Sequence, residues 1–186
     1  MDWQKTAENM KKRGFTVRRY ATGAEAAEAL CGELKGQEIG MGGSVTAAQL
    51  GLPEKLEAAG CTVYARGRSW DRKDTDKGVT APVYISSANG VAETGELVNI
   101  DGTGNRVAAL CFGPTQVVVV AGMNKVAGDL DGAMRRAREV AAPMNAQRFP
   151  LKTPCVANGL CGDCKGPDSI CAQIVTTRFS KIPGRI

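Results

Sequence analysis

The sequence has 186 residues, 43% of them hydrophobic and 23% charged, and its formal net charge is +5. This composition is typical of a globular protein and excludes a disordered or fibrous chain. At about 150 residues per domain, the length predicts a single domain over residues 1–186. Because the chain has no histidine, mechanisms based on imidazole are excluded, including Ser-His-Asp and Cys-His pairs and histidine metal ligands.

The apolar and basic residues indicate where the protein is located and whether it contacts a membrane or a nucleic acid. No apolar run approaches the ~20 residues of a membrane-spanning helix, and the N-terminus is polar without an apolar signal core. We therefore expect a cytoplasmic protein with no membrane contact. The densest basic cluster, Arg135, Arg136 and Arg138, has no interleaved aromatic residues, which indicates a solvated helix face rather than a nucleic-acid interface.

Strands and helices alternate along most of the chain, which is typical of a parallel or mixed sheet covered on both faces. Ligands of such sheets bind at the carboxyl ends of the strands. In chain order, the patterns predict helix 3–13, strand 15–20, helix 24–34, strand 38–41, helices 46–50 and 54–59, strand 62–65, a charged loop 69–80, strands 83–86 and 97–100, helix 107–110, strand 116–121, helix 130–141 and strand 172–179.

A first glycine-rich turn, IGMGGSVT over residues 39–46, joins a predicted strand to a predicted helix. Its backbone N–H groups and the positive helix end suit an anion such as phosphate or carboxylate. A tight turn with a serine cap is an equal alternative. The anion-binding candidates here are Gly42, Gly43, Ser44 and Thr46.

Two further glycine-rich segments, residues 86–106 and 122–125, crowd amides, carboxylates and cations at predicted strand ends. In residues 86–106 such polar convergence favours a binding site over plain turns, which stay the alternative. For residues 122–125 a helix-entry turn is an equal alternative. The anion-binding candidates are Asn89, Asn99, Gly104, Asn105, Arg106, Asn124 and Lys125. Glu93 and Asp101 are the candidate acid–base residues, because a catalytic carboxylate has to lie close to the bound substrate.

The seven cysteines are unevenly placed. Cys31, Cys61 and Cys111 lie among apolar neighbours and are expected to be buried. The other four lie in a turn-rich loop over residues 153–172, with a spacing typical of metal or cluster ligands: Cys155, Cys161, Cys164 and Cys171. The alternatives are a [4Fe-4S] cluster, a structural zinc ion and free or redox-active thiols. The cluster is favoured, because only Cys161 and Cys164 form the paired C-x2-C hook that zinc sites repeat.

The motifs IGMGGSVTAAQLG, SSANGVAETGELVNIDGTGNRVAALCFGP, VVVVAGMNKV and AAPMNAQRF, followed by the four cysteines, resemble the LUD-domain family. The likeness is to lactate-utilisation protein C and to a branch with a C-terminal four-cysteine loop. It implies a Rossmann-like three-layer α/β sandwich of the ribose-5-phosphate isomerase and CoA-transferase type. It also implies a role in lactate or hydroxy-acid utilisation, a small anionic metabolite as ligand, and iron–sulfur partner subunits.

The central motif is also similar to sugar-phosphate isomerases, in which an Asp acts as acid and base and an Asn-Lys pair holds phosphate. Asn89 stands at the Asp position and Ile100 at the Lys position, and an amide cannot transfer the proton. The resemblance leaves Glu93 as a replacement base and Ser44, Thr46 and Arg106 as the anion frame.

Three function classes therefore stay open: a redox subunit with an anionic ligand, an isomerase or transferase acting on a phosphorylated or CoA-linked substrate, and a zinc-stapled interaction subunit without catalysis. The resemblance also predicts a further strand where the sequence stops, at Ile186. We therefore expect an exposed sheet edge that pairs with a second copy of the chain.

Overall fold

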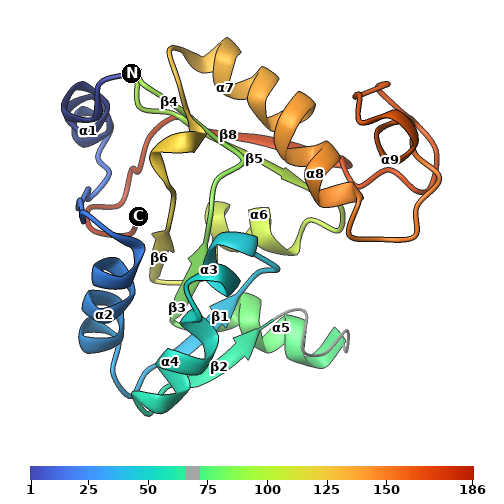
Figure 1. Ribbon diagram of the computed structural model, residues 1–186. Helices are drawn as coiled ribbons and strands as arrows, with labels where there is room; N and C mark the ends of the chain where they lie inside the picture. The colour runs from blue at the N-terminus through green and yellow to red at the C-terminus, as the bar shows by residue number, and fades with distance from the viewer. Residues whose placement is uncertain (66–71) are drawn as a thin grey trace. The chain divides into compact units, whose positions relative to one another are not determined.

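The computed structural model in Figure 1 describes residues 1–65 and 72–186. The helices are α1 (Trp3–Lys12), α2 (Gly23–Glu33), α3 (Val45–Gln49), α4 (Leu52–Ala58), α5 (Arg72–Thr80), α6 (Asn105–Cys111), the 3-10 turn η1 (Met123–Lys125), α7 (Leu130–Arg136), the π-helical segment η2 (Ala137–Ala141), α8 (Ala142–Ala146) and α9 (Pro154–Asn158). The strands are β1 (Glu38–Met41), β2 (Thr62–Ala65), β3 (Val83–Ser86), β4 (Gly90–Ala92), β5 (Leu97–Asp101), β6 (Gln116–Val119), β7 (Val126–Ala127) and β8 (Gln173–Thr177).

The chain forms two compact units. The parallel-sheet unit comprises residues 16–87, 108–121 and 182–186. The mixed-sheet unit comprises residues 1–15, 88–107 and 122–181. Both are built from strands covered by helices, which confirms the predicted α/β class. Within the described residues, no helix is long and apolar enough to cross a bilayer.

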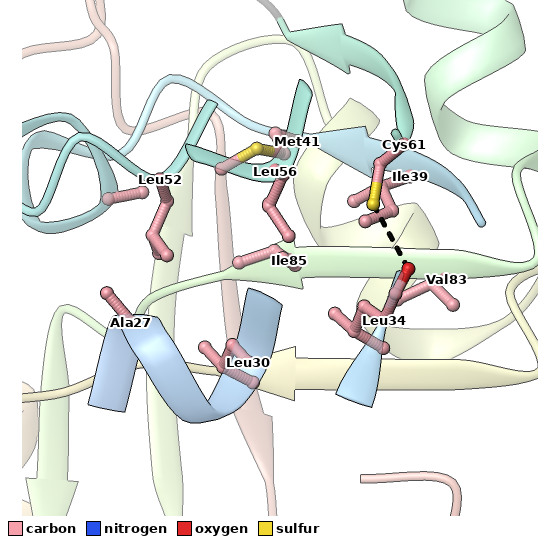
Figure 2. Close-up of a cluster of buried hydrophobic side chains, with 11 residues drawn as sticks. Ala27, Leu30, Leu34, Ile39, Met41, Leu52, Leu56, Cys61, Val83 and Ile85 are labelled. Carbon is pink, nitrogen blue, oxygen red and sulfur yellow. Dashed lines mark hydrogen bonds between the residues drawn. The ribbon is translucent and has the colours of Figure 1, made fainter. Parts of the chain in front are cut away.

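The parallel-sheet unit has four parallel strands in the order β2-β1-β3-β6. Strand β3 is buried at every position, as expected for a central strand of a covered parallel sheet. One face of the sheet packs against α2 and α4 through apolar side chains from all these elements (Figure 2). The core residues drawn there include Ala27, Leu30, Leu34, Ile39, Met41, Leu52, Leu56, Cys61, Val83 and Ile85.

The opposite face of this sheet is covered by α5. The contact is made by backbone, since a Cβ atom on Gly40 of β1 would overlap the carbonyl oxygen of Gly78 in α5. Helices therefore lie on both faces, which gives the three layers that the family resemblance implies. The sequence predicts a loop over residues 69–80, and this is wrong for residues 72–80, because a glycine contact leaves no apolar periodicity to detect. Residues 69–71 lie outside the described residues.

The end of the chain is part of the parallel-sheet unit. The buried Arg185 donates hydrogen bonds to the carbonyl oxygens of Ala109 and Leu110, both at 2.8 Å, and of Pro114 at 3.1 Å. Its own carbonyl oxygen accepts from the backbone nitrogen of Val117 in β6 at 2.6 Å. The arginine thus satisfies carbonyls that the last turn of α6 leaves without helical partners. Pairing of this edge with a second copy stays a prediction.

The mixed-sheet unit has the strand order β7-β4-β5-β8, with β4 and β7 parallel and the other two pairs antiparallel. Helix α7 and segment η2 pack on it through small residues, since a Cβ atom on Gly90 would overlap the carbonyl oxygen of Ala133.

The sequence predicts neither β4, β7 nor α9. The strand predicted over 15–20 is absent, and there the backbone nitrogen of Thr16 instead donates to the carbonyl oxygen of Ile186 at 2.8 Å.

The helix predicted over 130–141 continues to Ala146 and widens in its middle. Proline has no N–H and its ring clashes with the carbonyl four residues earlier, which here is that of Glu139. Pro143 therefore explains why residues 137–141 adopt the π-helical form. The widened turn lies between Arg136 and α8, and it carries Arg138.

Candidate functional site

Asn89, which follows β3 and precedes β4, is the meeting point of two arginine side chains in the mixed-sheet unit. Arg106 donates from Nη2 to Oδ1 of Asn89 at 3.1 Å and also to the carbonyl oxygen of Ile100. Arg136 of α7 donates to the carbonyl oxygen of Asn89 and, from Nε, to that of Asn124 at 2.9 Å. Oδ1 of Asn89 also accepts from the backbone nitrogen of Ile100 at 3.0 Å. Asn89, predicted to bind an anion, therefore accepts hydrogen bonds from two cations, from Arg106 through its side chain and from Arg136 through its backbone carbonyl.

Lys125 is the third cation of this group. Burial, together with the positive charges of Arg136 and Arg106, lowers its pKa to about 8. We call Arg106, Lys125 and Arg136 the cation group. Like charges that repel one another disfavour protonation, and a bound anion would relieve the repulsion. Charge-assisted hydrogen bonds from such a group suit phosphate or carboxylate.

The two carboxylates predicted as acid–base residues are held by other parts of the chain. Asp101 accepts hydrogen bonds from the backbone nitrogens of Arg106 at 2.9 Å, Val107 at 3.1 Å and Thr103 at 3.2 Å, which caps the start of α6. Glu93 accepts from Lys5 Nζ and from the backbone nitrogen of Asp2, both at 2.8 Å. The hydrogen bond from Lys5 lowers the pKa of Glu93. An acid–base role for either carboxylate stays a prediction.

The first glycine-rich turn lies in the parallel-sheet unit and has the geometry of a capped turn. Oγ of Ser44 accepts from the backbone nitrogen of Ala47 at 3.2 Å, and the backbone nitrogen of Ser44 donates to the carbonyl oxygen of Gly42 at 2.7 Å. Gly42 is buried and Gly43 is exposed. The helix that follows, α3, has only five residues. Anion binding at Gly42, Gly43, Ser44 and Thr46 stays a prediction.

The remaining polar candidates lie around β5. Asn99 is fully buried within the strand, and Oδ1 of Asn105 accepts from the hydroxyl of Thr103 at 2.7 Å. Gly104 has a φ of 83°, a left-handed conformation that favours glycine and turns the chain into α6. These residues therefore build the turn that carries Arg106.

The four cysteines of the C-terminal loop line one cavity of about 70 Å³ in the mixed-sheet unit. Burial, together with the neighbouring Cys161, Cys164 and Cys155, raises the pKa of the Cys171 thiol to about 11. Within the described residues, no three His, Cys, Asp or Glu side chains are arranged so as to hold one metal ion. The four cysteine residues thus line a common space.

The three other cysteines lie in the parallel-sheet unit. The thiol of Cys61 is buried and donates to the carbonyl oxygen of Leu34 at 3.0 Å (Figure 2). Cys31 is partly buried, whereas Cys111 is exposed, so its predicted burial is wrong.

The cysteine loop, residues 153–172, is built from local contacts and lies next to α8 (Figure 1). Thr153 is buried and its hydroxyl lies 3.3 Å from Sγ of Cys155. The two legs of the loop are joined by a hydrogen bond of 2.8 Å from the backbone nitrogen of Lys152 to Oδ2 of Asp168. Gly159 ends α9 with a φ of 77°. These contacts shape the loop whose outer cysteines, Cys155 and Cys171, line the same cavity.

The hook between Cys161 and Cys164 is held on two sides. A Cβ atom on Gly162 would lie 2.8 Å from Cγ of Pro154, so only glycine fits there without a shift. Asp163 has a φ of 49°, and its Oδ1 accepts from Nη2 of Arg138 at 2.6 Å. The loop therefore contacts the helix at the π-helical turn.

The family model of the LUD domain matches residues 3–186. The chain belongs to the LUD-domain family. This is a family related to lactate utilisation, as the motifs predicted. No curated protein and no solved structure matches the chain.

The candidate site residues that sequence reasoning missed in this LUD domain are Arg136 and Arg138. The predicted solvated face describes only Arg135, which is exposed. Arg136 joins the cation group and Arg138 lines the cysteine cavity. The sequence marks these two arginines only by their positions. Both are neighbours of Ala137, which is fully buried and lies one helical turn after the buried Ala133.

Proposed function

We propose that this LUD-domain protein is a redox subunit of lactate or related hydroxy-acid utilisation and that its cysteine loop holds a [4Fe-4S] cluster. The observation that supports this most is that Cys155, Cys161, Cys164 and Cys171 line one cavity. Such a cluster transfers single electrons and is held by four cysteine thiolates. In the described chain all seven cysteines are free, so we place the protein in the cytoplasm, where thiols stay reduced.

The dimensions of the site favour a cluster over a single zinc ion. Tetrahedral zinc with Zn–S bonds of about 2.3 Å requires four sulfurs about 3.8 Å apart. Among the described residues, no three cysteines are grouped as such a zinc site requires. A cavity of about 70 Å³ has room for several atoms, given that one water needs roughly 10–15 Å³. In a cluster each cysteine binds a different iron, so wider spacing fits. Structural zinc is the alternative.

The decisive experiment is anaerobic expression followed by iron, sulfide and zinc assays. We expect about four irons and about four sulfides per chain and broad visible absorption. Cys164→Ser should lose both iron and sulfide. Cys111→Ser is the matched control, because this exposed cysteine lies outside the loop and its loss should leave the iron content unchanged.

Two other results would replace the proposal. One zinc per chain without visible absorption would leave a metal-stapled interaction subunit. Iron that is bound but not lost in Cys164→Ser would place the centre elsewhere in the chain. Under the redox proposal, the electrons pass to and from iron–sulfur partner subunits.

The cation group favours a second candidate function, the binding of a small anionic metabolite. Arg106, Lys125 and Arg136 gather positive charge at the ends of β4 and β5 and at η1. An isomerase or transferase acting on a phosphorylated or CoA-linked substrate would use the same group. Its acid–base residue would be Glu93 or Asp101, and the structural hydrogen bonds of both make binding without catalysis the better supported form.

Calorimetric titration with inorganic phosphate tests this second candidate. Arg106→Gln and Arg136→Gln should each weaken binding by about 1.5–3 kcal/mol, or roughly 10- to 150-fold. Arg135→Gln is the control, because this exposed arginine lies beside Arg136 on the same helix. Equal phosphate affinity in all three variants would contradict a site at the cation group.

A further inference from the structure

Arg138 occupies a special place at the cysteine cavity. It lines the cavity together with the four cysteines, and it also lines an adjoining open hollow of about 390 Å³ with Glu139, Leu160 and Cys161. Its side chain is 41% exposed. The guanidinium therefore lies between the interior of the cavity and the solvent.

Its partner Asp163 has an unusual backbone. Among the described residues, Asp163 is the non-glycine residue with a left-handed conformation, at a φ of 49°. This conformation is unfavourable for a side-chain-bearing residue, and it persists where surrounding contacts hold it. The contact here is the ion pair of 2.6 Å between Asp163 and Arg138. Since Asp163 lies between Cys161 and Cys164, this ion pair ties the hook to the π-helical segment η2.

The fold, and not the loop, determines where Arg138 lies. The preceding residue, Ala137, is fully buried against the mixed sheet, and Pro143 accounts for the π-helical turn that displaces Arg138 from a regular helical position. On the other side of the hook, Gly162 packs against Pro154. The hook is therefore held between a rigid helix and the start of α9.

We infer that Arg138 is a positioning residue of the cysteine centre, which orders the Cys161–Cys164 hook through Asp163 and places a positive charge beside the bound group. The inference rests on the proposed function, since the second effect requires a redox centre. Reduction adds one electron to the centre, and the added negative charge is stabilised by a nearby cation. Arg138 is thus expected to raise the reduction potential and to keep the hook closed.

The first experiment measures the midpoint potential of the anaerobically prepared protein by titration with dithionite, followed by visible absorption and electron paramagnetic resonance. Arg138→Gln should lower the potential while iron remains bound. Arg138→Lys keeps the charge and should restore most of the potential. Arg135→Gln, on the exposed face of the same helix, should leave it unchanged. A potential in Arg138→Gln equal to that of the wild type would overturn the electrostatic part.

The second experiment does not need the cluster, so it separates this inference from the proposed function. Hydrogen exchange of the metal-free protein is followed by mass spectrometry over peptides that contain residues 159–166. Arg138→Gln and Asp163→Ala should increase exchange there, while Asp163→Gly should do so less, because glycine adopts the left-handed conformation without strain. Equal exchange in Arg138→Gln and Arg135→Gln would overturn the ordering of the hook, whatever metal the wild type binds.

Discussion

The apolar core of the parallel-sheet unit and the cysteine loop of the mixed-sheet unit are ordered by different interactions. The core around β1 and β3 consists of buried aliphatic side chains from α2, α4 and the sheet. Within the described loop only Cys171 packs against an apolar core, and the contacts that order the rest include hydrogen bonds, an ion pair and a close glycine contact. Apolar burial tolerates exchange of one side chain for a similar one, whereas the loop depends on particular residues at particular atoms.

The largest expected difference between the two regions is in the loss of stability when a leucine is replaced by alanine. Leu56 is fully buried in the core, whereas Leu160 of the cysteine loop is 68% exposed. Leu56→Ala should lower the free energy of unfolding by about 2–5 kcal/mol, because it leaves a cavity. Leu160→Ala should change it by less than about 0.5 kcal/mol. Urea denaturation followed by circular dichroism compares the two, and equal losses would contradict the distinction.

The second comparison is between the contributions of two arginines, Arg185 and Arg138, to stability. Arg185 is buried and donates three hydrogen bonds to carbonyl oxygens of the parallel-sheet unit, whereas Arg138 has one exposed ion pair. Arg185→Gln should cost about 2–3 kcal/mol, because buried carbonyls lose a charged donor. Arg138→Gln should cost less than about 1 kcal/mol. Thermal unfolding of both variants measures the difference, and a larger loss in Arg138→Gln would reverse the comparison.

Lys125 gives the mixed-sheet unit a specific pH dependence. Its pKa falls from 10.5 to about 8 on folding, so the unfolded chain binds more protons between these values. The contribution of this group to stability is therefore unfavourable below pH 8 and improves as the pH rises toward 10.5.

After allowance for partial exposure, this gain is on the order of 1–2 kcal/mol. In Lys125→Met the corresponding rise should be absent, and stability at pH 7 should exceed that of the wild type. Urea midpoints measured from pH 7 to 10.5 provide the comparison, and identical profiles would contradict it.

The smallest effect on the free energy of unfolding is expected at two glycines of the cysteine loop, Gly162 and Gly166. Their replacement is expected to differ in its effect on iron content. Gly162→Ala forces a Cβ atom against Pro154, whereas Gly166 has nothing within 4 Å of that position. Both changes should alter the free energy of unfolding by less than about 0.5 kcal/mol. Iron content should fall in Gly162→Ala and stay unchanged in Gly166→Ala. Equal iron content in both would show that the close contact does not shape the hook.

The sequence by itself determined the parts of this protein whose signal is local. Strands over 38–41, 62–65 and 83–86 were predictable, because buried strands are short apolar runs bounded by turn residues. The grouping of four cysteines was predictable because seventeen residues hold them all. Family motifs spanning the chain gave the LUD domain.

Only the tertiary structure decided the roles of polar residues and close glycines. Helix α5 was predicted as a loop, since its sheet contact is the backbone of Gly78. Asp101 caps α6, and Arg136 and Arg138 bind groups that lie 12 to 47 residues away in the chain. Apolar burial repeats with the period of the element and is visible in the sequence. A polar side chain acquires its function from one partner atom, and only the folded chain brings that atom within reach.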